Sequence, residues 1–319
     1  MGIETRKIVI IGAGHVGSHC AFSLAVQGVC DEIILVDTDE AKAKANAIDL
    51  CDAVAYLPHR VKAKMGSLND CKNADIVVVS LGVPPEANKS RLDFLGDTIK
   101  EIDTIIEPIL ESGFGGIFIV ISNPVDVIAH YIWMKTGFPK QKVFGTGTTL
   151  DSARLRRILS DETGIDQKSI QGYCMGEHGD SQMVPWSHVY LGGKPLLDFI
   201  KENPEVYGKS NLEELTNRTA NAAFDIIKGK GCTEFGIGAG LTEIVKTIFH
   251  DEKKILPAST LLEGQYGQNN VFASAPVIMG KDGIEGIVEI NLTEDEKRKF
   301  SHSCEILKEY IEKSKTLQI

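Results

Sequence analysis

The chain has 319 residues, of which 43% are hydrophobic and 24% charged, so it is long enough to bury a large core and form two domains. Its net charge of −10, without a dense lysine and arginine cluster, excludes nucleic acid as an expected partner. No apolar run approaches the roughly 18 to 20 residues of a membrane-spanning helix, so no membrane association is expected. The seven scattered cysteines show neither zinc-site spacings nor an even disulfide set, so we expect a cytoplasmic protein without a metal site.

Short β-branched runs alternate with helical patterns in the first 145 residues. Four such runs stand at residues 7–11, 32–36, 75–79 and 117–121. Their continuous apolar character is typical of parallel strands that are buried on both faces. Between the first two runs, Val16, Cys20 and Leu24 recur at helical spacing and complete a strand–helix–strand unit. Repeated units with right-handed crossovers predict an α/β fold, namely a doubly wound parallel sheet covered by helices.

The pattern changes after about residue 146. A long helix is expected at 150–163, followed by shorter strands at 187–190 and 271–279 that mix with further helices. This mixture is typical of an α+β arrangement. We therefore expect two domains, 1–145 and 146–319.

The C-terminal segment 294–313 carries the pattern of a helix. Thr293 and Glu296 fit a capping box at its start. Its apolar stripe consists of Phe300, Cys304, Leu307 and Ile311. We expect this helix to pack on the rest of the domain through that stripe.

A glycine-rich turn joins the first predicted strand to the first helix. At such a turn, glycines allow a tight bend, the close approach of a pyrophosphate and close helix packing, while the helix N-terminus attracts phosphate. The predicted dinucleotide-binding residues of this turn are Gly12, Gly14, His15, Val16 and Gly17.

Asp37 indicates which dinucleotide is expected. It lies 20 residues after Gly17, at the end of the second strand, where a carboxylate accepts hydrogen bonds from an adenosine ribose. A carboxylate there repels the 2′-phosphate of NADP, and the neighbouring Thr38 and Asp39 provide no arginine for it. NAD is therefore the expected cofactor. The alternatives are a turn without a ligand and a kinase glycine loop, which lacks its companion motifs here.

A histidine between glycines, His178 in the run 176–181, is the candidate acid and base. Oxidising a secondary alcohol with NAD requires a base for the hydroxyl proton, and imidazole titrates near neutrality. Asp151 and Arg154 stand three apart at a predicted helix start, so both can face one cavity. We predict that Asp151 orients the imidazole and that Arg154 binds a substrate carboxylate. The alternatives are a surface histidine and a surface ion pair.

Two more segments follow predicted strands, at the sheet edge where ligands bind. The segment from Gly82 to Arg91 contains turn formers, as an active-site lid would, and Arg91 is the candidate to polarise a substrate carbonyl. Gly82 and Asn123 are candidate contacts for the cofactor, and Asn123 also for the substrate. The alternatives are a solvated loop arginine and a strand-ending turn.

Together, these segments resemble the motifs of the lactate and malate dehydrogenase family, in order and over nearly the full chain. The segments are 12–17 with Asp37, 91–93, 122–126, 150–154 and 176–180. The resemblance implies a Rossmann NAD-binding domain, a mixed α/β substrate-binding domain and a homo-oligomer, dimeric or tetrameric. It also implies the proton-transfer roles of His178 and Asp151, the carboxylate contact of Arg154 and the lid position of Arg91.

The resemblance implies a small 2-oxo or 2-hydroxy acid as substrate. Malate enzymes carry arginine six residues before the lid arginine and typical lactate enzymes carry glutamine, whereas this chain has Pro85. Malate is disfavoured, because its second carboxylate needs a cationic partner. Thr233 matches a threonine that bounds the side-chain pocket of lactate-type enzymes. We expect reversible reduction of pyruvate to L-lactate; the alternative is an L-2-hydroxyisocaproate dehydrogenase for bulkier 2-oxo acids, which segments 120–128 and 145–148 also resemble.

Three further possibilities are disfavoured by particular residues. Family members activated by fructose 1,6-bisphosphate pair an arginine like Arg156 with a histidine seven residues before the catalytic one, where this chain has Gln171. A non-catalytic NAD-binding protein would not need the set of His178, Asp151 and Arg154. An NAD-dependent glycoside hydrolase would need a metal site, and the sequence offers no convincing one.

Overall fold

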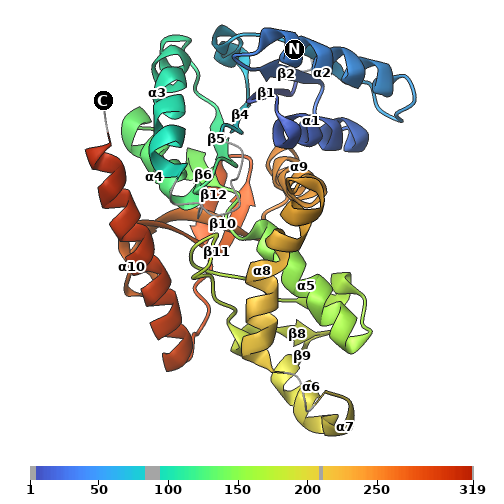
Figure 1. Ribbon diagram of the computed structural model, residues 1–319, viewed down its shortest axis with the longest axis vertical. Helices are drawn as coiled ribbons and strands as arrows, with labels where there is room; N and C mark the ends of the chain where they lie inside the picture. Colours follow the sequence, from blue (N-terminus) through green and yellow to red (C-terminus); the bar gives the residue numbers. More distant parts are fainter. Residues whose placement is uncertain (1–4, 83–93, 208–210, 318–319) are drawn as a thin grey trace.

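The computed structural model describes residues 5–82, 94–207 and 211–317 and contains two sheets (Figure 1). The strands of the larger sheet are β1 (Lys7–Ile11), β2 (Glu32–Val36), β3 (Lys62–Met65), β4 (Ile76–Val79), β5 (Ile117–Val120), β6 (Val143–Gly145), β10 (Lys254–Glu263), β11 (Asn269–Gly280) and β12 (Gly283–Ile287). The smaller sheet consists of β7 (Ile170–Gln171), β8 (Tyr190–Leu191) and β9 (Lys194–Pro195).

Six strands of the larger sheet are parallel, in the order β3-β2-β1-β4-β5-β6. This is the order of a doubly wound dinucleotide-binding sheet, so the predicted fold class is confirmed. The order reverses between β1 and β4, and ligands bind beyond the carboxyl ends of the strands at such a point. The turn at Gly12 and the segment that begins at Gly82 follow these two strands.

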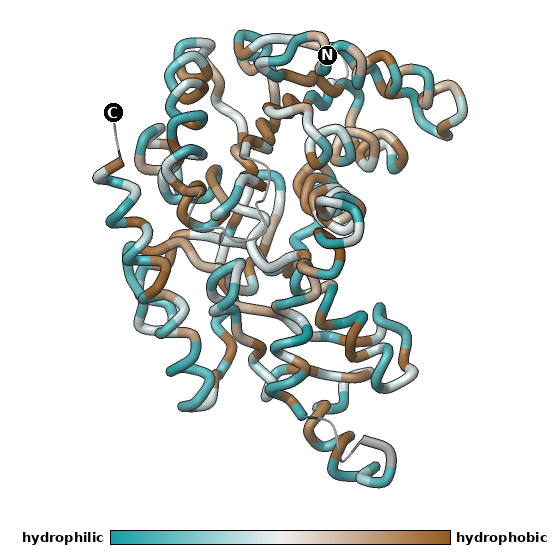
Figure 2. The backbone as a smooth tube through the Cα atoms, in the orientation of Figure 1, coloured by the Kyte–Doolittle hydropathy of each residue, from teal (hydrophilic) through white to brown (hydrophobic). Residues whose placement is uncertain are grey.

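Helices cover both faces of the sheet. Those that share a core with its strands are α1 (His15–Gln27), α2 (Glu40–Val54), α3 (Leu95–Glu111), α4 (Val125–Thr136), α9 (Phe235–Phe249) and α10 (Glu294–Thr316). The other described helices are α5 (Thr149–Thr163), α6 (Leu196–Glu202), α7 (Pro204–Tyr207) and α8 (Leu212–Lys230). Val9 and Ile11 of β1 pack into the core shared with α3, α4 and α10, while Ile8 and Ile10 pack towards α1, α2 and α9. This alternation explains why β1 is apolar from Ile8 to Ile11, and the hydrophobic colouring of the central strands agrees with it (Figure 2).

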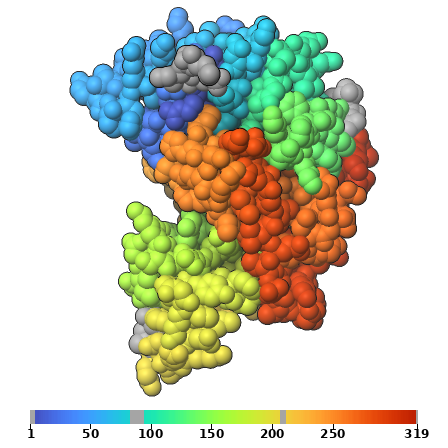
Figure 3. Space-filling view, turned by 180° about the vertical axis from the view of Figure 1, so that it is seen from behind, coloured from blue at the N-terminus to red at the C-terminus, as the bar shows by residue number. Residues whose placement is uncertain are grey.

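The sheet does not stop at the end of the first half of the chain. Ser259 of β10 pairs with Gly145 of β6, and β10, β11 and β12 then continue it as antiparallel strands. The part of the chain between these regions has a separate apolar core, formed by residues of α5, α6, α8, β7 and β8 and the segments between them. Seen from behind, this part forms a lobe at the lower end of the molecule, coloured lime to yellow (Figure 3).

One expected strand was wrong, and one expected helix is confirmed. Residues 186–188 form a short 3-10 helix after Pro185, and the strand β8 begins only at Tyr190. The amide and hydroxyl of Ser187 bind Glu296 instead of a neighbouring strand. The C-terminal helix α10 has the predicted capping box of Thr293 and Glu296. Among the described residues, no helix combines the length and apolar character needed to cross a membrane.

Candidate functional site

The turn between β1 and α1 has the shape that phosphate binding requires. Gly12 has a φ of 98°, and a Cβ there would lie 2.3 Å from the carbonyl oxygen of Ser80. A Cβ on Gly17 would lie 1.9 Å from the carbonyl oxygen of Gly12, so the third glycine allows helix and turn to touch. A Cβ on Gly14 would meet no described atom within 4 Å, and no described side chain caps the first turn of α1. Open space therefore faces uncapped backbone amides.

Asp37 connects the end of β2 to this turn. Its Oδ2 accepts a hydrogen bond from the Ala13 amide at 2.7 Å, and its Oδ1 accepts one from the Asp39 amide at 2.9 Å. The ammonium of Lys42 lies 3.1 Å from Oδ2. Burial alone would raise the pKa of Asp37, but these hydrogen bonds and Lys42 hold it below its ordinary value. Lys42 was not among the predicted site residues, because it stands in the first turn of α2 and not next to Asp37 in the sequence.

Three predicted site residues, His178, Asp151 and Arg154, form one buried constellation. The Nδ1 of His178 lies 2.5 Å from the Oδ2 of Asp151. The other carboxylate oxygen, Oδ1, accepts a hydrogen bond from the Nη1 of Arg154 at 2.9 Å. The side chains of Arg154 and Asp151 are 6% and 2% exposed, and that of His178 is 12% exposed. This burial rules out the surface ion pair and the surface histidine that the sequence left open.

The backbone of His178 is fixed by Asp126, whose part in the site the sequence analysis did not recognise. The Oδ2 of Asp126 accepts a hydrogen bond from the His178 amide at 2.8 Å. Asp126 is buried near the start of the apolar helix α4. Burial raises the pKa of its carboxyl to about 7, against the lowering effect of the neighbouring Ser259 and of the hydrogen bond from the His178 amide. The signal in the sequence is an acidic residue inside an otherwise apolar helix start.

Neighbouring residues of the turn are held by other elements. The Glu177 amide donates to the hydroxyl of Ser303 on α10 at 2.8 Å. The Glu177 carboxylate accepts hydrogen bonds from the amide and hydroxyl of Ser181. Gly176 forms an antiparallel bridge with Ser274 of β11. The turn is thus anchored to a helix and a strand of the C-terminal part, which restricts where the imidazole can point.

The other predicted residues occupy different places around the sheet edge. Gly82 and Asn123 follow the neighbouring strands β4 and β5, and Asn123 is exposed. Thr233 is half-buried just before α9. Arg91 and Pro85, the predicted lid arginine and specificity position, lie outside the described residues.

His15 brings the glycine turn to the start of α9. Its side chain is 83% exposed, and its Nδ1 lies 3.0 Å from the Oε1 of Glu234. The hydrogen bond from Lys230 lowers the pKa of Glu234 to about 2, so this carboxyl is ionised at neutral pH. Glu234, like Lys42 and Asp126, was not among the residues predicted from the sequence. Its role depends on a contact between segments far apart in the chain.

Two family descriptions match adjacent parts of the chain. Residues 6–145 match the NAD binding domain of lactate/malate dehydrogenase, and residues 148–318 match its alpha/beta C-terminal domain. The chain belongs to the lactate/malate dehydrogenase family. Membership makes it an NAD-dependent oxidoreductase of 2-hydroxy acids, which confirms the predicted enzyme class and cofactor.

Proteins that match almost the full chain are named lactate dehydrogenase or malate dehydrogenase. L-lactate dehydrogenase 3 of Bacillus thuringiensis subsp. konkukian is 46% identical over 308 residues, which cover 97% of this chain and 98% of that protein. The L-lactate dehydrogenase of Fusobacterium nucleatum is 44% identical over 317 residues, covering 99% of each. The minor L-lactate dehydrogenase of Enterococcus mundtii with ligands bound has a TM-score of 0.94 at 36% identity, covering 98% of this chain and 99% of that one. Cryptosporidium parvum malate dehydrogenase has a TM-score of 0.90 at 31% identity with the same coverage, so the fold alone does not separate the activities.

Proposed function

We propose that this enzyme is an L-lactate dehydrogenase, which reduces pyruvate to L-lactate with NADH and catalyses the reverse reaction. The observation that carries the proposal is the buried contact in which Asp151 joins the His178 imidazole to the Arg154 guanidinium. The relatives at 44% and 46% identity carry the lactate name, which supports pyruvate as substrate. Proline at position 85 argues against a dicarboxylate, because it offers no charge to a second carboxylate.

The residues around the glycine turn fit a dinucleotide. The space at Gly14 and the uncapped amides of α1 would accept the pyrophosphate, and Asp37 would accept hydrogen bonds from the adenosine ribose. Gly82 and Asn123, at the ends of β4 and β5, would line the nicotinamide end of the site. Bound NADH supplies the hydride that the carbonyl carbon of pyruvate receives.

His178 with Asp151 would transfer the proton, and Arg154 would bind the substrate carboxylate. Because the Nδ1 of His178 faces Asp151, Nε2 is the atom that donates a proton to the carbonyl oxygen, which becomes the lactate hydroxyl. In oxidation the same atom takes this proton back. The Asp151 carboxylate holds the imidazole through Nδ1, and Arg154 binds the pyruvate carboxylate through paired hydrogen bonds. We assign carbonyl polarisation to Arg91, and we assign Pro85 and Thr233 to the pocket for the substrate methyl group.

Loss of NADH absorbance tests this function directly. Pyruvate, oxaloacetate and 4-methyl-2-oxopentanoate are compared at saturating NADH, and we expect pyruvate to give the highest kcat/KM. A preference for the branched acid would favour the hydroxyisocaproate alternative, and a preference for oxaloacetate would contradict the role of Pro85. H178Q should lower kcat by at least 100-fold because it removes the acid, whereas H302Q on the exposed face of α10 should leave kcat unchanged.

We also infer the surroundings in which the enzyme works. All seven cysteines are free thiols, which fits the reducing cytoplasm.

Exposed apolar side chains on α1, α2 and α9 support a homo-oligomer. Gln171 on β7 argues against activation by fructose 1,6-bisphosphate. We further propose that residues 1–145 bind the cofactor and that residues 146–319 bind the substrate.

A further inference from the structure

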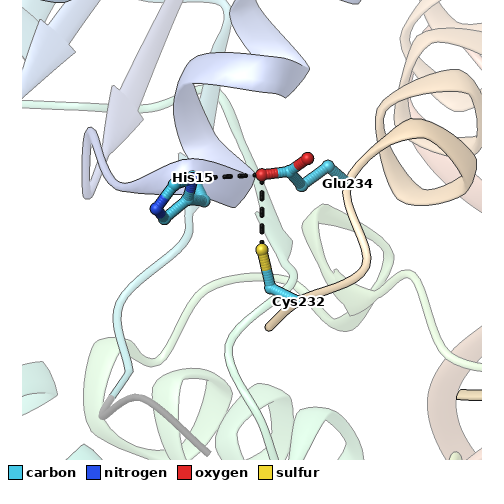
Figure 4. A group of neighbouring side chains, drawn as sticks. All are labelled: His15, Cys232 and Glu234. Atoms are coloured by element: carbon cyan, nitrogen blue, oxygen red, sulfur yellow. Dashed lines mark hydrogen bonds and ion pairs between the residues drawn. The ribbon is translucent and has the colours of Figure 1, made fainter. Parts of the chain in front are cut away.

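Three metal-ligating side chains meet where the glycine turn faces the segment between α8 and α9 (Figure 4). His15 is the first residue of α1, and Cys232 and Glu234 stand between α8 and α9. One ligand atom from each residue lies within 4.8 Å of the other two. The sequence predicted no metal site, because the cysteines lack zinc-site spacings. His15 lies far from Cys232 and Glu234 along the chain, so this cluster has no local pattern.

The contacts within this cluster are directed at one oxygen of Glu234. Its Oε1 lies 3.0 Å from the Nδ1 of His15 and accepts a hydrogen bond from the Sγ of Cys232 at 3.3 Å. Its Oε2 is held on the other side by the ammonium of Lys230 at 2.7 Å, with the Nδ1 of His19 at 3.8 Å. Lys230 thus fixes the carboxylate so that Oε1 faces the imidazole and the thiol. A charged partner behind a ligand is a common device for orienting it.

We propose that His15, Cys232 and Glu234 bind a divalent transition-metal ion, with Zn²⁺ as the best match. Zinc takes an imidazole nitrogen, a thiolate sulfur and a carboxylate oxygen at about 2.0 to 2.3 Å, so donor atoms of a tetrahedral site lie about 3.3 to 3.7 Å apart. The two donor contacts with Oε1 are 3.0 and 3.3 Å, so small side-chain movements are enough. Calcium and magnesium are excluded as preferred ions, because a thiolate and an imidazole are poor ligands for them.

A metal ion at this position would affect cofactor binding. This part of the inference rests on the proposed function of the glycine turn. An ion bound by His15 would tie the first turn of α1 to the start of α9. The dinucleotide phosphates are proposed to bind at this same first turn of α1, so the metal and NADH would compete. Zinc would then inhibit at low NADH, and saturating NADH would relieve the inhibition.

Calorimetric titration of Zn²⁺ into the reduced full-length protein, without nucleotide or chelating buffer, tests the site itself. We expect one ion per chain and at least a tenfold weaker affinity in both C232S and H15A. His15 is largely exposed, so H15A should not disturb folding. The double variant C51S/H302A removes an exposed cysteine and an exposed histidine outside the cluster and should bind like the unmodified protein. Unchanged binding in C232S and H15A, or no binding by the unmodified protein, would overturn the proposal.

Cobalt provides a second readout that does not depend on activity. Co²⁺ bound through Cys232 should produce a thiolate-to-metal charge-transfer band in the near ultraviolet, which C232S should lose and C51S should keep. A spectrum without this band in the unmodified protein would also overturn the site. The outcome is separable from the proposed function: a protein that reduces no pyruvate but binds Co²⁺ through Cys232 contradicts the dehydrogenase assignment and supports the metal site.

Discussion

Asp126 of α4 is buried, and its carboxyl contacts the His178 amide and lies near Ser259 of β10. The hydrogen bond from the His178 amide needs only an acceptor oxygen, which a protonated carboxyl or a carboxamide also provides. Burial makes the ionised form costly and raises the pKa of this group to about 7. A charge on Asp126 is therefore not required to position His178, and it opposes folding.

Asp126→Asn should change how stability depends on pH. A carboxyl with a raised pKa in the folded state stabilises the fold at low pH and loses that contribution as the pH rises through about 7. Between pH 5 and pH 8 the variant should gain about 2 to 3 kcal/mol relative to the unmodified protein. Urea unfolding at both pH values measures this difference, with D49N on the exposed face of α2 as control. An equal difference at both pH values would contradict the buried-acid interpretation.

Arg154→Lys tests whether the guanidinium binds the substrate carboxylate. Lysine keeps the charge but cannot form two parallel hydrogen bonds to a carboxylate, so the KM for pyruvate should rise about 10- to 100-fold. The matched control is R157K on the same helix, where Arg157 is exposed and pairs with Asp161. Steady-state kinetics measures both variants. A KM equal to that of R157K would remove Arg154 from the carboxylate site.

The sequence predicted the site residues that stand in a recognisable local pattern. It missed the residues whose role comes from contacts made only in the folded structure. His178, Asp151 and Arg154 stood out because of their glycine context and helical spacing, and the structure joins them. Asp126 could not be connected with His178, because 52 residues separate them. Glu234 meets His15 only after α9 has packed against α1. Such pairs follow from tertiary structure and leave no spacing to recognise.

The glycine turn offers an element-scale test that separates folding from ligand binding. G17A should cost about 1 to 3 kcal/mol or more, because its Cβ would lie 1.9 Å from a backbone oxygen. G14A should stay within about 0.5 kcal/mol, because its Cβ meets no described atom and its φ is −74°. Yet G14A should weaken NADH binding at least tenfold, because the methyl group occupies the proposed pyrophosphate space. Urea unfolding and NADH fluorescence titration measure the two effects; full NADH affinity in G14A would contradict the phosphate assignment.

Elements were predictable where one pattern filled the whole segment. β4 and β5 are apolar along their length, and β1 and β2 are apolar after their first residue, because helices cover both faces. β3 was missed because Lys62 and Lys64 alternate with Ala63 and Met65 on an edge strand, which gives a short and weak signal. β10 was missed as well, although it pairs along most of its length with β11. Its pattern is interrupted by Pro257, and its burial depends on the strands beside it.

For the whole molecule, the continuous sheet limits how the two halves of the chain move. The antiparallel strands β10 to β12 extend the cofactor sheet, so the part after residue 145 is not joined by a linker alone. The turn of His178 is fixed to the helices α4 and α10 and to β11 of this extension. The proposed proton-transfer pair is thus positioned by the same sheet that carries the glycine turn after β1. Sequence patterns predicted the two halves of the chain but not the pairing of β6 with β10. Pairing between distant segments leaves no local pattern in the sequence.

Exposed apolar side chains on three helices mark a surface for the proposed homo-oligomer. Phe22 of α1, Ile48 of α2 and Phe235 of α9 are 44%, 53% and 68% exposed, and α1 contacts both other helices. Burying such side chains between two copies would favour assembly. Sedimentation velocity should show a dimer or tetramer, and F22E/I48E should shift it to a smaller species, whereas L317E at the C-terminus should not. A monomeric unmodified protein would contradict the assembly, and an unchanged F22E/I48E would place the interface elsewhere.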